Sequence, residues 1–262
     1  MNEQFCFQRF WTYFKYDIVQ MWRNHGKAAL LLGGAGVILY VVYVLSSLVF
    51  PDHVWEAPGE QTRAGVYAFA SMLFVLFQAR TYGYLTEKRA GSAWLMLPAS
   101  SAEKTLSMLL MTLLVLPLAF LFVYLGSDAL LCLLDPGMGN SLLSSFNLAE
   151  LQGEEVAGMR FPLSLLLFFM QASILTYFLL CGLIFKKWKI SGGIAVLFGL
   201  MTLLVFILAA LAESNLIHVE FSSDLADDSR TLAFLWTAVA VCFLTWAALA
   251  WGVYRRVKTI KH

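Results

Sequence analysis

The chain has 262 residues, of which 60% are hydrophobic and only 13% are charged, and its formal net charge is +1 at pH 7. A soluble globular domain averages about 25% charged residues, so this composition excludes an ordinary soluble protein. The small net charge hides a separation: Lys and Arg gather in alternate segments between apolar runs, and Asp and Glu gather in the others. Basic segments beside a bilayer stay in the cytoplasm. The alternation therefore predicts an all-α polytopic membrane protein with six transmembrane helices and both termini in the cytoplasm.

Residues 1–27 are expected to form a cytoplasmic interfacial helix before the first crossing. Apolar side chains recur at helical spacing on one side of residues 5–23, at Phe7, Phe10, Trp11, Phe14, Ile18 and Met21. The opposite side is polar and includes Arg9 and Lys15. An aromatic face with cations opposite is typical of a helix that lies in the membrane interface. Packing of the same face against a soluble partner is the alternative.

Residues 28–262 are expected to form the six-helix transmembrane domain. The predicted spans are Ala28–Phe50, Ala64–Gln78 (with an extension to Leu85 left open), Thr105–Leu125, Phe161–Phe185, Ile190–Leu211 and Thr231–Tyr254. Most approach the roughly 20 residues that cross a hydrocarbon core of about 30 Å. Pro117 is expected to kink the third span. Small residues in the first and fifth spans, such as Gly33 and Gly193, suit close helix packing within the chain or in a dimer.

Three connectors, 51–63, 126–160 and 212–230, are predicted to lie outside the membrane. Arg63, Arg160 and Arg230 sit at the outer starts of spans, where their side chains are expected to snorkel to the interface. The second connector carries the turn signal Asp135-Pro136-Gly137. The acidic end of the third lacks the spacing of a calcium-binding loop, so we expect a solvated loop and no metal site.

The predicted spans hold no Asp, Glu, Lys, Arg or His in their interiors, and the sequence has no His-Glu-x-x-His motif. These features count against an ion-coupled transporter and an intramembrane protease, so no catalytic residue and no enzymatic activity are expected. Mild polar residues do occur at depth. One interpretation is a substrate path, and the more frequent one is hydrogen bonding between helices. The candidates for the path are Ser71, Gln78, Ser164 and Gln171.

The cytoplasmic connector 79–104 has more features than positive charge requires. Glu87 and two cations precede Gly91, an apolar group of Trp94, Leu95 and Leu97 follows, and Pro98 ends it. Ser100 and Glu103 have the spacing of a capping box, which predicts that a new helix starts there. An exposed apolar knob on a basic surface generally contacts a partner, so we expect one here.

The order of residues in this connector resembles the intracellular loop of type-2 ATP-binding-cassette exporter permeases, including those of Bacteroidetes-like bacteria. In that family the loop forms a coupling helix that docks on an ATPase subunit. The resemblance implies that this chain docks through Glu87, Gly91, Trp94, Leu95, Leu97, Pro98, Ser100 and Lys104. Ser92 stands where the family usually has Thr.

The resemblance implies a permease subunit of an exporter in the bacterial inner membrane. The sequence has no Gly-x-x-x-x-Gly-Lys-Ser/Thr loop, so ATP is expected on a separate ATPase subunit and no cofactor on this chain. The expected partners are that cytoplasmic ATPase, a second permease copy or homologue, and membrane lipids, with no nucleic acid. The alternative function is a membrane anchor or assembly protein that recruits a cytoplasmic partner without a transport path.

Overall fold

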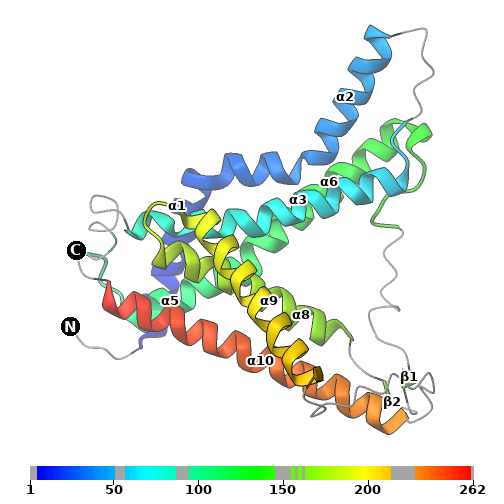
Figure 1. Cartoon of the computed structure of the whole chain (residues 1–262). Helices are drawn as coiled ribbons and strands as arrows, with labels where there is room; N and C mark the ends of the chain where they lie inside the picture. The colour runs from blue at the N-terminus through cyan, green and yellow to red at the C-terminus, as the bar shows by residue number, and fades with distance from the viewer. Residues whose placement is uncertain are drawn as a thin grey trace.

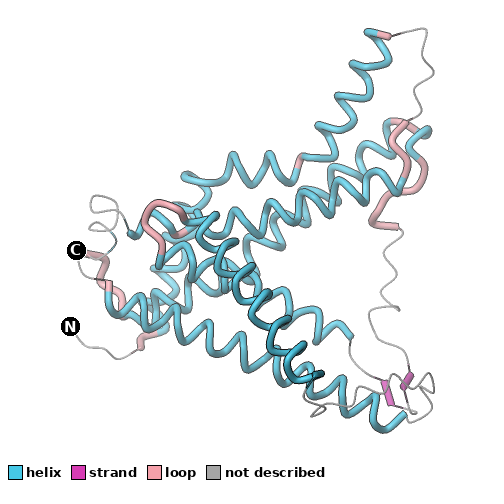
Figure 2. Tube along the Cα trace, viewed as in Figure 1, coloured by secondary structure: helices cyan, strands magenta, loops and turns pink. Residues whose placement is uncertain are grey.

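The computed structural model describes residues 5–50, 57–86, 94, 96–144, 155–156, 159–160, 163–213 and 228–260, with the side chains of 155–163, 204 and 207–234 left aside. Glu87, Gly91 and Leu95 of the expected docking loop, and most of connector 212–230, lie outside these residues. Helices joined by loops make up the described part, together with one pair of two-residue strands, β1 (Glu155–Val156) and β2 (Met159–Arg160), which pair antiparallel (Figure 2). This helical architecture agrees with the fold class expected from the sequence.

The long helices form two groups that diverge from a common end (Figure 1). One group holds α1 (Phe7–Gly33), α2 (Ala35–Val49), α3 (Glu60–Thr81), α5 (Ser101–Leu110) and α6 (Leu116–Leu134). The other holds α8 (Leu163–Ile184), α9 (Lys189–Glu213) and α10 (Asp228–Thr259). Short helical turns complete the first group: η1 (Gly83–Thr86) after α3, η2 (Met111–Val115) between α5 and α6, and η3 (Pro136–Met138) after α6.

The helix expected to end before residue 28 continues to Gly33, so the first break lies later than the sequence suggested. α1 and α2 meet at Gly34 and are bent by 51°. Glycine tolerates the irregular backbone of such a junction. Gly33 lies against Val123 of α6, and Gly36 faces the ring of Tyr124. These two glycines therefore serve packing within the chain.

The interruption expected at Pro117 takes the form of a π-helical turn, η2, inside a helical run from Ser101 to Leu134. Proline has no N–H to donate and its ring crowds the carbonyl group four residues earlier. That carbonyl belongs to Leu113, which lies within η2. The wider turn accommodates the ring without ending the helix.

α8 is the central helix of the second group and packs against α3, α9 and α10. At its contact with α3, a Cβ atom on Gly182 would overlap the carbonyl oxygen of Ala79, so only glycine allows this approach. The hydroxyl of Ser173 donates to the carbonyl of Cys242 on α10, and that of Tyr177 donates to the carbonyl of Gly193 on α9. Ser173 thus confirms the interhelical hydrogen bonding expected of mild polar residues.

By length and composition, four helical stretches of the described chain can cross a membrane, and the bent pair α1–α2 makes a fifth candidate. The four are Glu60–Thr86, Ser101–Leu134, Ser164–Ile184 and Leu235–Thr259. Helices of this length and composition are those of a membrane protein. The start of α1, the start of α5, the turn between α8 and α9 and the end of α10 all lie at the common end (Figure 1). This end carries the basic segments of the sequence.

Candidate functional site

The end of the connector that leads into α5 is fixed to α1 through the carboxylate of Glu103. The expected capping box is present: the hydroxyl of Ser100 accepts from the N–H of Glu103, and the Ser100 N–H donates to the Glu103 carboxylate. The same carboxylate accepts from the backbone N–H of Cys6 at 2.8 Å and from the Arg9 guanidinium at 2.7 and 2.8 Å. A helix cap thus also serves as the attachment point for the start of α1.

Trp94 forms a second attachment between the connector and α1. Its indole N–H donates to the hydroxyl of Tyr13 at 2.8 Å. The ammonium group of Lys104 donates to the Trp94 carbonyl at 3.0 Å and lies 4.4 Å from the centre of its ring. The Trp94 side chain belongs to a core cluster with Tyr82, Leu179 and others from η1, α8 and α10. Both groups of helices therefore meet around this residue.

Asp17 forms a third attachment, at greater depth. One carboxylate oxygen accepts from the Tyr82 hydroxyl at 2.7 Å and from the Ser107 hydroxyl at 2.6 Å. Asp17 is only 2% exposed, so these two donors replace water around its carboxylate. The seven residues that join α1 to the connector, η1 and α5 are called the connector cluster here: Tyr13, Asp17, Tyr82, Trp94, Glu103, Lys104 and Ser107.

The expectation of an exposed apolar knob is wrong for Trp94, which is 3% exposed, and Leu97 is partly buried against the same core. The indole ring packs in the core, and its N–H donates to the Tyr13 hydroxyl there. An exposed Trp94 would lose the apolar contacts and this hydrogen bond. Lys104 is also buried, while Ser100 is half-buried as the helix cap. Of the expected docking residues that the structure describes, only Pro98 is exposed; the nearby Met96 is 84% exposed.

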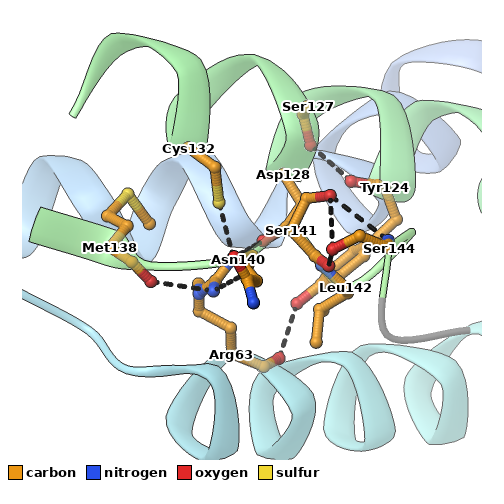
Figure 3. Close-up of polar contacts among 10 residues, drawn as sticks. All are labelled: Arg63, Tyr124, Ser127, Asp128, Cys132, Met138, Asn140, Ser141, Leu142 and Ser144. Atoms are coloured by element: carbon orange, nitrogen blue, oxygen red, sulfur yellow. Dashed lines mark hydrogen bonds and ion pairs between the residues drawn. The ribbon is translucent and has the colours of Figure 1, made fainter. Parts of the chain in front are cut away.

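A second buried polar site lies at the far end of the first group, around Arg63 (Figure 3). Its guanidinium donates to the Asp128 carboxylate at 2.6 Å, to the sulfur of Cys132 at 2.9 Å and to the carbonyl groups of Met138 and Asn140 at 3.0 and 2.6 Å. The expectation that Arg63 snorkels to the interface is therefore wrong. Its side chain is 1% exposed, because a carboxylate and two carbonyl groups offer partners inside the protein.

These groups are called the Arg63 cluster: Arg63, Asp128, Cys132 and the carbonyl groups of Met138 and Asn140. The second Asp128 oxygen accepts from the backbone N–H of Leu142 at 2.8 Å. The cluster thus joins the start of α3, the second half of α6 and the segment that follows η3. The turn expected at Asp135 is confirmed at η3 itself, since the Asp135 carboxylate caps η3 by accepting from the Gly137 N–H.

The four residues proposed to line a substrate path do not form one polar site in this structure. Ser71 donates to a carbonyl of its own helix, Gln78 is fully buried, and Ser164 and Gln171 are exposed on α8. No hydrogen bond joins any two of them in the described part of the chain. Fully buried polar atoms without a partner do occur on three neighbouring elements, at Gln78 of α3, Thr112 of η2 and Thr176 of α8.

The sequence signals for the two clusters were incomplete. The Ser100–Glu103 spacing identified the cap, but nothing local indicates that Cys6 and Arg9 share the same carboxylate. Asp17 stands on the predicted apolar side of α1, one residue before Ile18, and a carboxylate in that position is the signal that could have found it. No protein-family model matches this sequence, and no curated protein or solved structure shows significant similarity to it.

Proposed function

We propose that this chain is the permease subunit of an ATP-binding-cassette exporter in the bacterial inner membrane, and that a separate ATPase subunit docks at the end bearing connector 79–104. The observation that carries the proposal is the connector cluster. It fixes a cytoplasmic connector to α1, η1 and α5 by buried hydrogen bonds, so displacement of the connector would move these helices with it. A coupling element requires a rigid attachment of this kind.

The arrangement of the helices supports six crossings with both termini in the cytoplasm. α9 supplies the sixth crossing, since it has 25 residues, although its described apolar part, Lys189–Leu203, is shorter than the other candidates. With α1–α2 counted as one bent span, successive spans run back and forth between the basic end and the far end (Figure 1). The positive-inside rule then places the common end in the cytoplasm.

The start of α1 supports an interfacial position for residues 1–27 in the described part. Phe7 and Trp11 are exposed, while Phe10 and Tyr13 of the same turns are buried. An exposed aromatic pair beside Arg9 suits the headgroup region of a bilayer. Met96 and Pro98 replace Trp94 and Leu97 as the apolar groups that an ATPase subunit would contact.

Exposed apolar faces on α2 and α9 support the membrane and a second permease as further partners. On α2 they include Val41, Leu45 and Leu48, and on α9 they include Phe198 and Phe206. Such faces are unfavourable in water and favourable against lipid or another apolar helix. The cargo class is not part of the proposal, because the expected path residues do not converge.

Affinity purification of the full chain from bacterial membranes tests the proposal. We expect a Walker-motif ATPase to copurify in stoichiometric amount, and Met96→Glu to weaken that association at least tenfold while the permease stays folded. Thr259→Glu, an exposed position at the end of α10, is the control for adding a carboxylate at the cytoplasmic end. Recovery of a folded permease without any ATPase subunit would refute the transporter assignment. A cytoplasmic partner that lacks a Walker motif would favour the anchor alternative.

A further inference from the structure

A basic pocket lies where α1, α3 and the turn between α8 and α9 meet. Its volume is about 820 Å³, and it is partly open to the surroundings. Four cationic side chains line it: Arg80 at the end of α3, and Lys186, Lys187 and Lys189 around the turn. Among the residues that the structure describes, no Asp or Glu lines it. Four cations around one cavity produce a positive potential that favours an anionic ligand.

The backbone adds to this potential. α9 begins at Lys189, and the residues of its first turn, including Ile190 and Ser191, line the pocket. The N–H groups of a first helical turn have no partner within the helix and carry partial positive charge, so they attract phosphate groups. The stem of Lys189 passes over Gly83, since a Cβ there would lie 2.8 Å from the lysine Cδ. This contact holds the lysine between η1 and the start of α9.

The other walls of the pocket are apolar and continue into an exposed apolar surface. Phe77, Ile190 and Ile194 line the cavity. Trp188 also lines the cavity, and this residue is 73% exposed. Ile194 is followed along α9 by Leu197 and Phe198, both exposed. A ligand that joins an anionic head to an apolar tail therefore has a surface for each part.

We propose that this pocket binds the phosphate-bearing headgroup of an anionic membrane lipid, with the acyl chains lying along α9 from Ile194 to Phe198. Basic pockets between transmembrane helices on the cytoplasmic side are suited to such headgroups, and an exposed Trp suits the interface. The inference rests on the proposed membrane orientation, but it requires no ATPase subunit and no transport. Apolar walls distinguish this pocket from a site for free phosphate, which would gain nothing from Phe77 or Ile194.

Native mass spectrometry of the purified full chain, titrated with phosphatidylglycerol or with phosphatidylcholine, tests the proposal. We expect phosphatidylglycerol to bind at least tenfold more tightly. Each cation near a membrane surface strengthens the binding of an anionic lipid roughly fivefold. The double variant Lys186→Gln with Lys187→Gln should therefore weaken the binding of phosphatidylglycerol about 25-fold. Both lysines are exposed and form no ion pair in the described chain, so the double variant should fold normally. Arg255→Gln with Lys258→Gln, at the end of α10, is the matched control and should change binding less than about threefold.

Three results would overturn the inference: equal binding of the two lipids, an equal loss in the control variant, or displacement of phosphatidylglycerol by millimolar inorganic phosphate. The last result would identify a free anion as the ligand. Gly83→Leu adds a second measurement. The new side chain should displace Lys189 and weaken the binding of the anionic lipid without removing a charge. The assay contains no ATPase subunit, so a failure of the proposed exporter function would leave its outcome unaffected.

Discussion

Removal of the Asp128 carboxylate should strongly destabilise the far end of the first helical group. Asp128 and Arg63 have side chains 2% and 1% exposed, and the carboxylate accepts from both the guanidinium and the Leu142 N–H. Loss of one partner of a buried ion pair costs about 3–5 kcal/mol, because the remaining charge stays buried. We therefore expect Asp128→Ala to lower the free energy of unfolding by about 4 kcal/mol. Thermal unfolding in detergent, followed by intrinsic fluorescence, measures the difference.

A double-mutant cycle separates the ion pair from general packing. Arg63→Met should cost about as much as Asp128→Leu, while the double variant should cost less than the sum by at least about 2 kcal/mol, because no charge is left unpaired. Asp135→Asn is the control in the same region: its side chain still accepts from the Gly137 N–H, so we expect a loss below about 1 kcal/mol. Additive losses in the cycle would show that the two groups are not coupled, and the cluster would then have no role in joining α3 to α6.

Two further predictions concern the contacts of α8 and α1. Gly182→Ala should lower the thermal midpoint of unfolding, because the new Cβ would overlap the Ala79 carbonyl and force α3 and α8 apart. The expected cost is about 1–3 kcal/mol. Gly199 has open space around it, so the control Gly199→Ala should not lower the midpoint. Asp17→Ala should leave the buried hydroxyls of Tyr82 and Ser107 without an acceptor, at about 1–3 kcal/mol for each, whereas Asp17→Asn should retain part of the bonding. Hydrogen exchange should rise around Ser107, in the second half of α5, in Asp17→Ala, and unchanged exchange there would contradict the assigned role.

The helices could be predicted from the sequence because their signals are local. Apolar runs of span length identified α3, α6, α8, α9 and α10, and the Ser100–Glu103 spacing identified the start of α5. The single span expected over Ala28–Phe50 is instead divided between the end of α1 and α2. The end of α1 was misplaced because the polar residues between Met21 and Ala28 looked like a boundary, yet helical backbone continues through them to Gly33. A few polar residues do not end a helix when no proline or C-capping glycine geometry stops it.

The clusters could not be predicted because their partners are far apart along the chain. Arg63 meets Asp128 across 65 residues, and Glu103 meets Arg9 across 94. The side chain of a charged residue at the end of a span can extend into the solvated headgroup region or pair with an opposite charge inside the protein. The local sequence does not distinguish these two positions. Trp94 has the same ambiguity: the apolar character that suggested a docking knob is equally suited to a core, and the hydroxyl of Tyr13 decides in favour of the core.

The positions of the two clusters have a consequence for any motion of the protein. Both buried ion-containing clusters lie in the first helical group, one at each end, and their loss would expose or orphan charged groups. In the described part of the second group, side chains of Ser173, Tyr177 and Arg256 join α8 to α9 and α10 by donating to backbone carbonyls. Losing a bond to a neutral acceptor generally costs less than losing one partner of a buried ion pair. Under the proposed function, docking at the cytoplasmic end would therefore act first on the first group, and it would reach the second group through the core around Trp94 and the contact between α3 and α8 at Gly182.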